Sequence, residues 1–148
     1  MKTYAFLVAS SLSLAGALPA LASDFGTALE ARAMLDRAVN ELKAGEVGAL
    51  AKFNDAAGGY RDRDLYIFCA DQDGKLVAHP ALPLGTDMRA IKDKNGKAVG
   101  EELFIAAKEG QYNLVSYMWP RPSSPYAVSK VSYMTRVGNA LCGVGYYK

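Results

Sequence analysis

Lys130 lies in the middle of a predicted strand and next to a strand with aromatic residues, so it could take part in binding chemistry. The strand of Lys130 extends from Ala127 to Val137, and the aromatic strand before it from Tyr112 to Trp119. Side chains alternate between the two faces of a strand, so Tyr117 and Trp119 share one face. An ammonium group beside aromatic walls and hydroxyl donors would hold a small anion. The pattern leaves open a simpler role, in which Lys130 faces solvent.

Two further side chains could contribute to such an anion site. His79 is the single histidine and precedes Pro80 at the end of a predicted strand. It could donate a hydrogen bond to a ligand, or it could bond a loop carbonyl. Tyr66 lies in an apolar run and could form a wall of the site, although a tyrosine in such a run can equally pack in the core.

The residue sets of common catalytic and metal centres are missing. The sequence has no G-x-S-x-G segment, and Cys69, in an apolar run without a neighbouring cation, is typical of an inert buried thiol. Cys69, His79 and Cys142 do not supply the four ligands of a structural zinc site. The segments 71–74 and 93–96 resemble calcium loops but lack an oxygen ligand at the first position, so we expect turns there. We expect no catalytic residue, no metal and no cofactor.

Residues 1–22 differ from the rest of the chain. Lys2 is the only charged side chain before Asp24, an apolar stretch follows it, and Ala20-Leu21-Ala22 places small residues where a signal peptidase cleaves. We expect a secretory signal peptide over 1–22, with an uncleaved membrane anchor as the alternative. Export would place residues 23–148 in the periplasm. A disulfide between the two cysteines is possible there but is not decided by the sequence.

Composition predicts one globular domain. The chain has 148 residues, of which 51% are hydrophobic and 22% charged, and its net charge is +2. That charge is too small to indicate a protein that binds nucleic acid or a membrane surface.

The N-terminal region, residues 25–55, has helical periodicity. Four apolar residues fall on one helical face: Leu35, Ala38, Val39 and Leu42. Glycines at 45 and 48 predict a break followed by a second short helix, with Val47, Leu50 and Phe53 facing inward.

From residue 64 onward the pattern is that of strands separated by turns, with one short helix over 101–109. Short connections predict antiparallel neighbours, and the N-terminal helix must cover one face of the sheet. The predicted fold class is therefore α+β, with a long N-terminal helix and a five-stranded antiparallel sheet whose strands cover 65–69, 75–79, 112–119, 127–137 and 140–147.

Taken in order, several segments resemble single-Cache (Cache type 2) extracytoplasmic sensor domains over residues 25–148. The segments that carry the resemblance are Asp64-Leu65-Tyr66-Ile67-Phe68, Asp71-x-Asp73-Gly74, Ala78-His79-Pro80, Asp93-x-Asn95-Gly96-Lys97, Tyr117-x-Trp119-Pro120-x-Pro122, Lys130-x-x-Tyr133 and Gly143-Val144-Gly145-Tyr146. The resemblance implies a PAS-like sheet behind the N-terminal helix. It also implies a pocket for a small organic acid, such as pyruvate, acetate or propionate. The pocket residues it implies are His79, Tyr117, Trp119 and Lys130, with Tyr66 and Met118 as further walls.

Sensors of this family belong to chemoreceptors and histidine kinases. The predicted signal peptide takes the place of the first membrane helix of those receptors, so we expect residues 23–148 to be a single Cache domain that presents a small carboxylate to a membrane sensor kinase or chemoreceptor. A homodimer along the N-terminal helix is compatible with this role. One alternative is an accessory or scaffold protein that docks a sensor kinase without a ligand. Another is a hydrolase using His79 or Cys69, for which no acid–base set is visible.

Overall fold

Two helices open the part of the chain that the computed structural model describes, residues 23–148. Helix α1 spans Ala28–Ala44 and α2 spans Glu46–Asn54. The Thr27 side chain accepts a hydrogen bond from the Glu30 N–H, and the Glu30 carboxylate accepts one from the Thr27 N–H. This capping box fixes where α1 begins. The predicted signal peptide lies outside the described residues.

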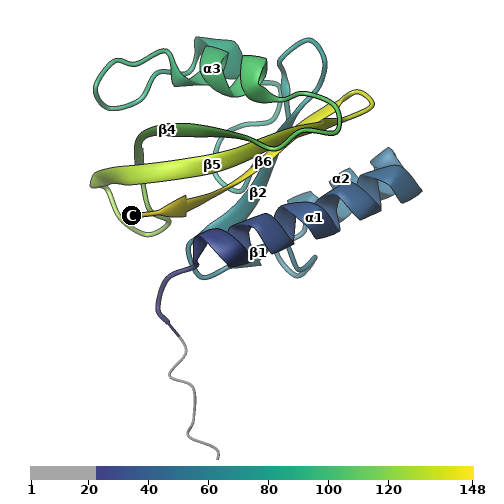
Figure 1. Cartoon of the computed structure of the whole chain (residues 1–148), viewed down its shortest axis with the longest axis horizontal. Helices are drawn as coiled ribbons and strands as arrows, with labels where there is room; N and C mark the ends of the chain where they lie inside the picture. Colours follow the sequence, from purple (N-terminus) through teal and green to yellow (C-terminus); the bar gives the residue numbers. More distant parts are fainter. Residues whose placement is uncertain (1–22) are drawn as a thin grey trace, which may run out of the picture.

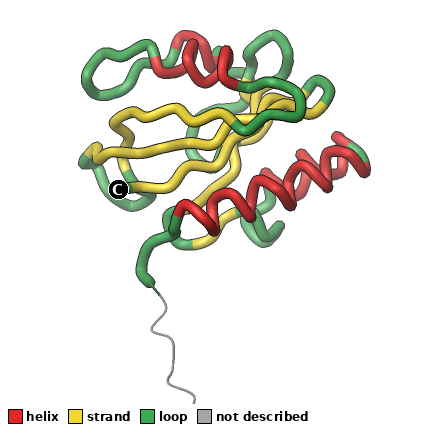
Figure 2. Tube along the Cα trace, in the orientation of Figure 1, coloured by secondary structure: helices red, strands yellow, loops and turns green. Residues whose placement is uncertain are grey.

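A six-stranded antiparallel sheet forms the centre of the fold (Figure 1, Figure 2). Its main order is β1-β2-β6-β5-β4, and β3 also pairs with β2. The α+β, PAS-like prediction is confirmed. The strands are β1 (Arg61–Asp62), β2 (Leu65–Ala70), β3 (Leu76–Ala78), β4 (Asn113–Pro120), β5 (Ala127–Val137) and β6 (Ala140–Tyr147).

The sixth strand, β1, is the difference from the predicted five. It has only two residues, both exposed, so it carries no apolar alternation that a sequence pattern could reveal. The chain turns at Arg63, whose φ of 55° is left-handed, and brings Arg61 opposite Tyr66.

Helices cover both faces of the sheet. Helices α1 and α2 lie on one face, and α3 (Val99–Ala106), which follows the 3-10 turn η1 (Met88–Ala90), lies on the other (Figure 1). The helix predicted over 101–109 is present but begins and ends a few residues earlier.

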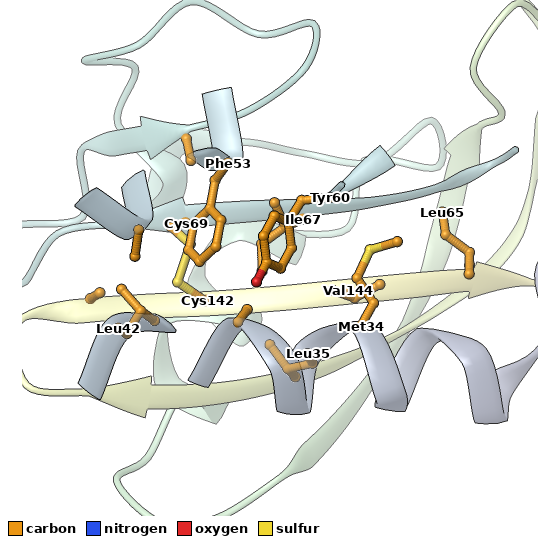
Figure 3. Packing of buried hydrophobic residues seen from close by; sticks show 14 of the residues in the cluster. Met34, Leu35, Leu42, Phe53, Tyr60, Leu65, Ile67, Cys69, Cys142 and Val144 are labelled. Carbon is orange, nitrogen blue, oxygen red and sulfur yellow. A yellow bond between two sulfur atoms is a disulfide. The ribbon is translucent and has the colours of Figure 1, made fainter. Parts of the chain in front are cut away.

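The α1 face holds the first apolar core. The four residues of the predicted helical face are buried, and Leu35 and Leu42 pack with Ile67 and Val144 of the sheet (Figure 3). In α2, Phe53 is buried as predicted, but Val47 is 86% exposed. The prediction for Val47 is wrong because the chain turns at Gly45, and α2 then packs through Ala49 and Phe53.

A disulfide links the two central strands on this face. Cys69 of β2 and Cys142 of β6 are directly opposite in register, and neither side chain is exposed. The bond joins residues 73 positions apart in sequence. It settles the pairing that the sequence left open and fixes β6 against β2.

Replacing both cysteines by alanine is expected to lower the free energy of unfolding. In the chain-entropy account, a disulfide that closes a loop of this length stabilises the folded state by about 4 kcal/mol. Urea denaturation of the double variant and of the reduced wild-type protein measures the effect. An unchanged unfolding midpoint in both would contradict it.

Candidate ligand-binding site

Four strands each place one polar or aromatic residue at the same point on the α3 face of the sheet. Lys130 of β5 pairs directly with Tyr117 of β4 on one side and with Tyr147 of β6 on the other. Tyr66 of β2 projects from the same face, and its hydroxyl oxygen lies 2.7 Å from the Lys130 Nζ. Because side chains alternate along a strand, this clustering follows from the register of the sheet.

Lys130 is buried without an acidic partner. Its side chain is 1% exposed, and its ammonium lies 3.9 Å from the centre of the Tyr66 ring and 4.8 Å from that of Tyr147. Among residues 23–148, no carboxylate forms an ion pair with it. Burial lowers the pKa of Lys130 from 10.5 to about 7. The site therefore holds an amine that is about half protonated near pH 7 and, when it is charged, has no counterion.

The carboxylate whose charge acts on Lys130 already has other hydrogen-bond partners. Asp64, just before β2, accepts a hydrogen bond of 2.7 Å from the Gly26 N–H and one of 3.2 Å from the Arg121 guanidinium. Its charge raises the pKa of Lys130, but burial lowers that pKa by more.

A glycine in β6 makes room for the lysine. Gly145 pairs with Ser132 beside Lys130 in the sheet. A Cβ at this position would collide with the Cε of Lys130 and the hydroxyl of Ser132. The aliphatic stem of the lysine therefore lies across β6 at a point where only glycine leaves space.

His79 is a neutral hydrogen-bond donor at the edge of the cluster. Its Nδ1 accepts the N–H groups of Ala81 (3.0 Å) and Leu82 (2.8 Å), so the proton of the neutral ring is on Nε2. Burial, followed by the charge of Lys130, lowers the pKa of His79 to about 4. The ring packs edge-on against Tyr66, with centroids 5.6 Å apart.

The aromatic hydroxyls also stay uncharged. Burial raises the pKa of Tyr66, Tyr117 and Tyr147 above the ordinary value of 10. The Tyr117 hydroxyl is paired with Ser132 at 2.8 Å, and that of Tyr147 donates to the Pro120 carbonyl at 2.8 Å.

Two adjoining cavities meet at this cluster. The inner one has a volume of about 30 Å³ and the outer one about 460 Å³, and four residues border both: Tyr66, His79, Leu82 and Trp119. The inner cavity reaches under α3, and its remaining walls are Phe68, Leu76, Met88, Ile91, Val99, Leu103 and Tyr117. Arginines lie at the outer cavity, namely Arg61, Arg63 and Arg121.

The structure brings together five of the six residues predicted from sequence. Tyr66, His79, Tyr117 and Trp119 line the inner cavity, and Lys130 lies behind Tyr66 and borders neither cavity. The sixth, Met118, projects from the opposite face of β4 and lines neither cavity.

Tyr147 and Gly145 were missed by the sequence analysis. A signal for both exists in the chain. The tight turn at 138–139 fixes the register of the last hairpin and thus places Tyr147 beside Lys130 and Gly145 beside Ser132.

The chemistry available to this cluster is recognition of a small anion. It offers one buried cation, hydroxyl and imidazole donors, and an apolar pocket, which together suit a carboxylate with a short apolar tail. In the described part of the chain, no three or more His, Cys, Asp or Glu side chains gather where they could hold a metal ion. No helix among residues 23–148 has the length and apolar character needed to cross a bilayer.

A family model described as a Cache domain matches residues 31–140. This chain belongs to the Cache domain family. Cache domains are extracytoplasmic sensor domains, and the family membership confirms the resemblance inferred from the ordered motifs.

Known Cache-containing proteins are similar to this chain in sequence and structure. The methyl-accepting chemotaxis protein McpP of Pseudomonas putida is 32% identical over 108 residues, which make up 72% of this chain but only 18% of that protein. A crystal structure of a methyl-accepting chemotaxis protein from Vibrio parahaemolyticus has the same fold, with a TM-score of 0.65 and 22% identity over 80% of this chain and 86% of that one. The structure of a Cache chemosensory domain that recognises carboxylic acids is also similar. Its TM-score is 0.60 and its identity 26%, over 80% of this chain and 86% of that one.

The Lys130→Met variant is expected to be more stable than wild type at pH 7. Between pH 7 and 10 the unfolded chain holds a proton on Lys130 that the folded protein does not, so folded wild type gains stability as pH rises. The variant removes this penalty, and we expect a gain of about 2 kcal/mol at pH 7 that disappears toward pH 10.

Urea denaturation at the two pH values measures this difference, with Lys92→Met as a control at an exposed position. Equal destabilisation of Lys130→Met at both pH values would show that Lys130 is not a strained cation.

Gly145→Ala is expected to displace the Lys130 side chain. The control is Gly143→Ala, which lies on the same strand as Gly145 but would crowd Met134 of β5 and Phe68 of β2 instead of Lys130. Only the Gly145 variant should change the titration of Lys130, measured by NMR of its Cε group. The same titration in both variants would contradict the positioning role of Gly145.

Proposed function

We propose that this Cache domain is a periplasmic binding domain for a short-chain monocarboxylate such as pyruvate, acetate or propionate, and that it is not an enzyme. The observation that carries the proposal is the buried ammonium of Lys130 without a counterion. Truncating one partner of a buried pair is costly, so a cation already without its partner gains strongly from an anion.

The geometry supports one orientation of the ligand. The carboxylate would lie at the junction of the two cavities, near the Tyr66 hydroxyl and His79, while its tail enters the apolar inner cavity. A second carboxylate in that inner cavity would be desolvated among apolar side chains, which disfavours dicarboxylates. An amide of the same shape would leave Lys130 without its counterion.

The relatives support the signalling role and the compartment. McpP is a chemotaxis protein. Another structurally similar chain is a periplasmic sensor domain of a chemotaxis protein. It is 25% identical, with a TM-score of 0.61 over 80% of this chain and 88% of that one. We therefore propose that the bound acid is presented to a chemoreceptor or a membrane sensor kinase. The predicted signal peptide agrees with a periplasmic site of action.

A thermal-shift screen of the purified protein with acetate, propionate, pyruvate, succinate and propionamide tests the proposal. A ligand present at a hundred times its dissociation constant stabilises the folded state by about 2.7 kcal/mol. We expect the three monocarboxylates to raise the melting temperature and propionamide to have no effect. A flat screen with folded protein would favour the ligand-free accessory role.

Calorimetric titration of variants with propionate tests which residues form the site. Lys130→Met should weaken binding on the order of 100-fold or more, and Tyr66→Phe by about tenfold. Met118→Ala, on the other face of β4, is the matched control and should bind as wild type. Unchanged affinity in Lys130→Met would overturn the site assignment.

A further inference from the structure

Few groups inside the folded protein stabilise the charged form of Lys130. Its one hydrogen-bond partner is the neutral Tyr66 hydroxyl. The titratable and charged groups that face it from the surrounding elements are Tyr66 of β2, Tyr147 of β6, Tyr117 of β4, His79 after β3, Asp64 before β2 and Arg121 after β4. The three tyrosines and the histidine are neutral near pH 7, and Asp64 is paired with Arg121.

The Tyr66 hydroxyl links the lysine to the cavities. Lys130 borders neither cavity, whereas Tyr66 borders both. A charged lysine can only donate, so the Tyr66 oxygen accepts from it and the hydroxyl hydrogen is free to point toward a ligand. A neutral lysine nitrogen can instead accept that hydrogen, which removes the donor from the cavity.

We infer that binding of a carboxylate at this site is coupled to the uptake of a proton by Lys130, so that the domain responds jointly to acidity and to carboxylate concentration. The inference rests on the proposed function. In the balanced step, a carboxylate anion enters, a proton from the buffer adds to the Lys130 amine, and an ammonium–carboxylate pair forms with the Tyr66 hydroxyl between its members. No covalent bond to the ligand is made or broken.

The coupling has a definite sign. The pKa of Lys130 is about 7 without ligand, and a carboxylate beside it raises that pKa. Binding then takes up about 0.1 proton at pH 6, about 0.5 at pH 7 and about 0.9 at pH 8. The affinity for propionate should be nearly constant below pH 6 and about fifty-fold weaker at pH 9 than at pH 7. His79 is neutral in the free protein over this range, because its pKa is about 4.

Calorimetry in two buffers tests the inference. Propionate is titrated into the purified protein at pH 8 in HEPES and in Tris, whose heats of ionisation differ. Proton uptake makes the two observed enthalpies differ by that difference times about 0.9. Equal enthalpies with clear binding would overturn the proton coupling and leave the binding function standing. If no heat appears and the protein is folded, both the function and the coupling fail.

A direct titration of the lysine provides the second measurement. NMR of the lysine Cε groups, with the Lys130 signal assigned by its loss in Lys130→Met, should show a midpoint near 7 in the free protein and above 9 with saturating propionate. A midpoint above 9 in the free protein would overturn the inference. Lys130→Arg is the matched variant, because a guanidinium stays charged and its binding should be independent of buffer and of pH between 6 and 9. If Lys130→Arg does not bind propionate, the NMR titration of Lys130 in the wild-type protein alone decides whether the inference holds.

Discussion

The hydrogen bond between the Lys130 ammonium and the Tyr66 hydroxyl is the interaction on which the arrangement of this domain depends. Burying a cation against a neutral phenol is unfavourable, because water is lost and no opposite charge replaces it. The fold tolerates this because two aromatic rings flank the ammonium and the sheet around it is well packed. The same arrangement that lowers stability would favour an anion at the proposed site, so stability and the proposed binding oppose each other at one side chain.

The sheet is what concentrates these groups. Lys130 lies on a strand between two neighbours, and both present a tyrosine at the paired position. Tyr66 comes from β2, which β6 separates from β5. Helix α3 then closes the apolar cavity over the same face, while α1 and α2 build a separate core on the other. The two faces thus differ: one holds the core that packs α1 and α2 on the sheet, and the other holds the cavity of the proposed ligand site.

Much of this could be predicted from the sequence, because strand alternation and turn residues carry strong local signals. The α1 face, the long strands and the pairing of Tyr117 with Trp119 on one side follow from periodicity alone. The burial of Lys130 does not, since a lysine between Ser129 and Val131 in a strand fits either face until the register is known. Strand β1 has no pattern, and the choice between free thiols and a disulfide required knowing that Cys69 lies opposite Cys142. The assignment of Met118 came from the family resemblance, whereas simple alternation along β4 places it on the face opposite Tyr117 and Trp119.

The position of the disulfide has a consequence beyond stability. The tight turn at 138–139 fixes β6 against β5, whereas the disulfide fixes β2, which carries Tyr66, against β6. A slip of β2 along β6 by two residues would keep the same side chains toward α1, so the hydrophobic pattern alone opposes it weakly. Such a slip would bring Phe68, which has no hydroxyl, or Asp64 to the place of Tyr66 beside Lys130. Because Cys142 is bonded to the residue directly opposite, that sliding is blocked on the far side of the sheet from the cavity. Reduction of one bond in the α1 core would therefore allow misalignment of the proposed pocket, which neither cysteine lines.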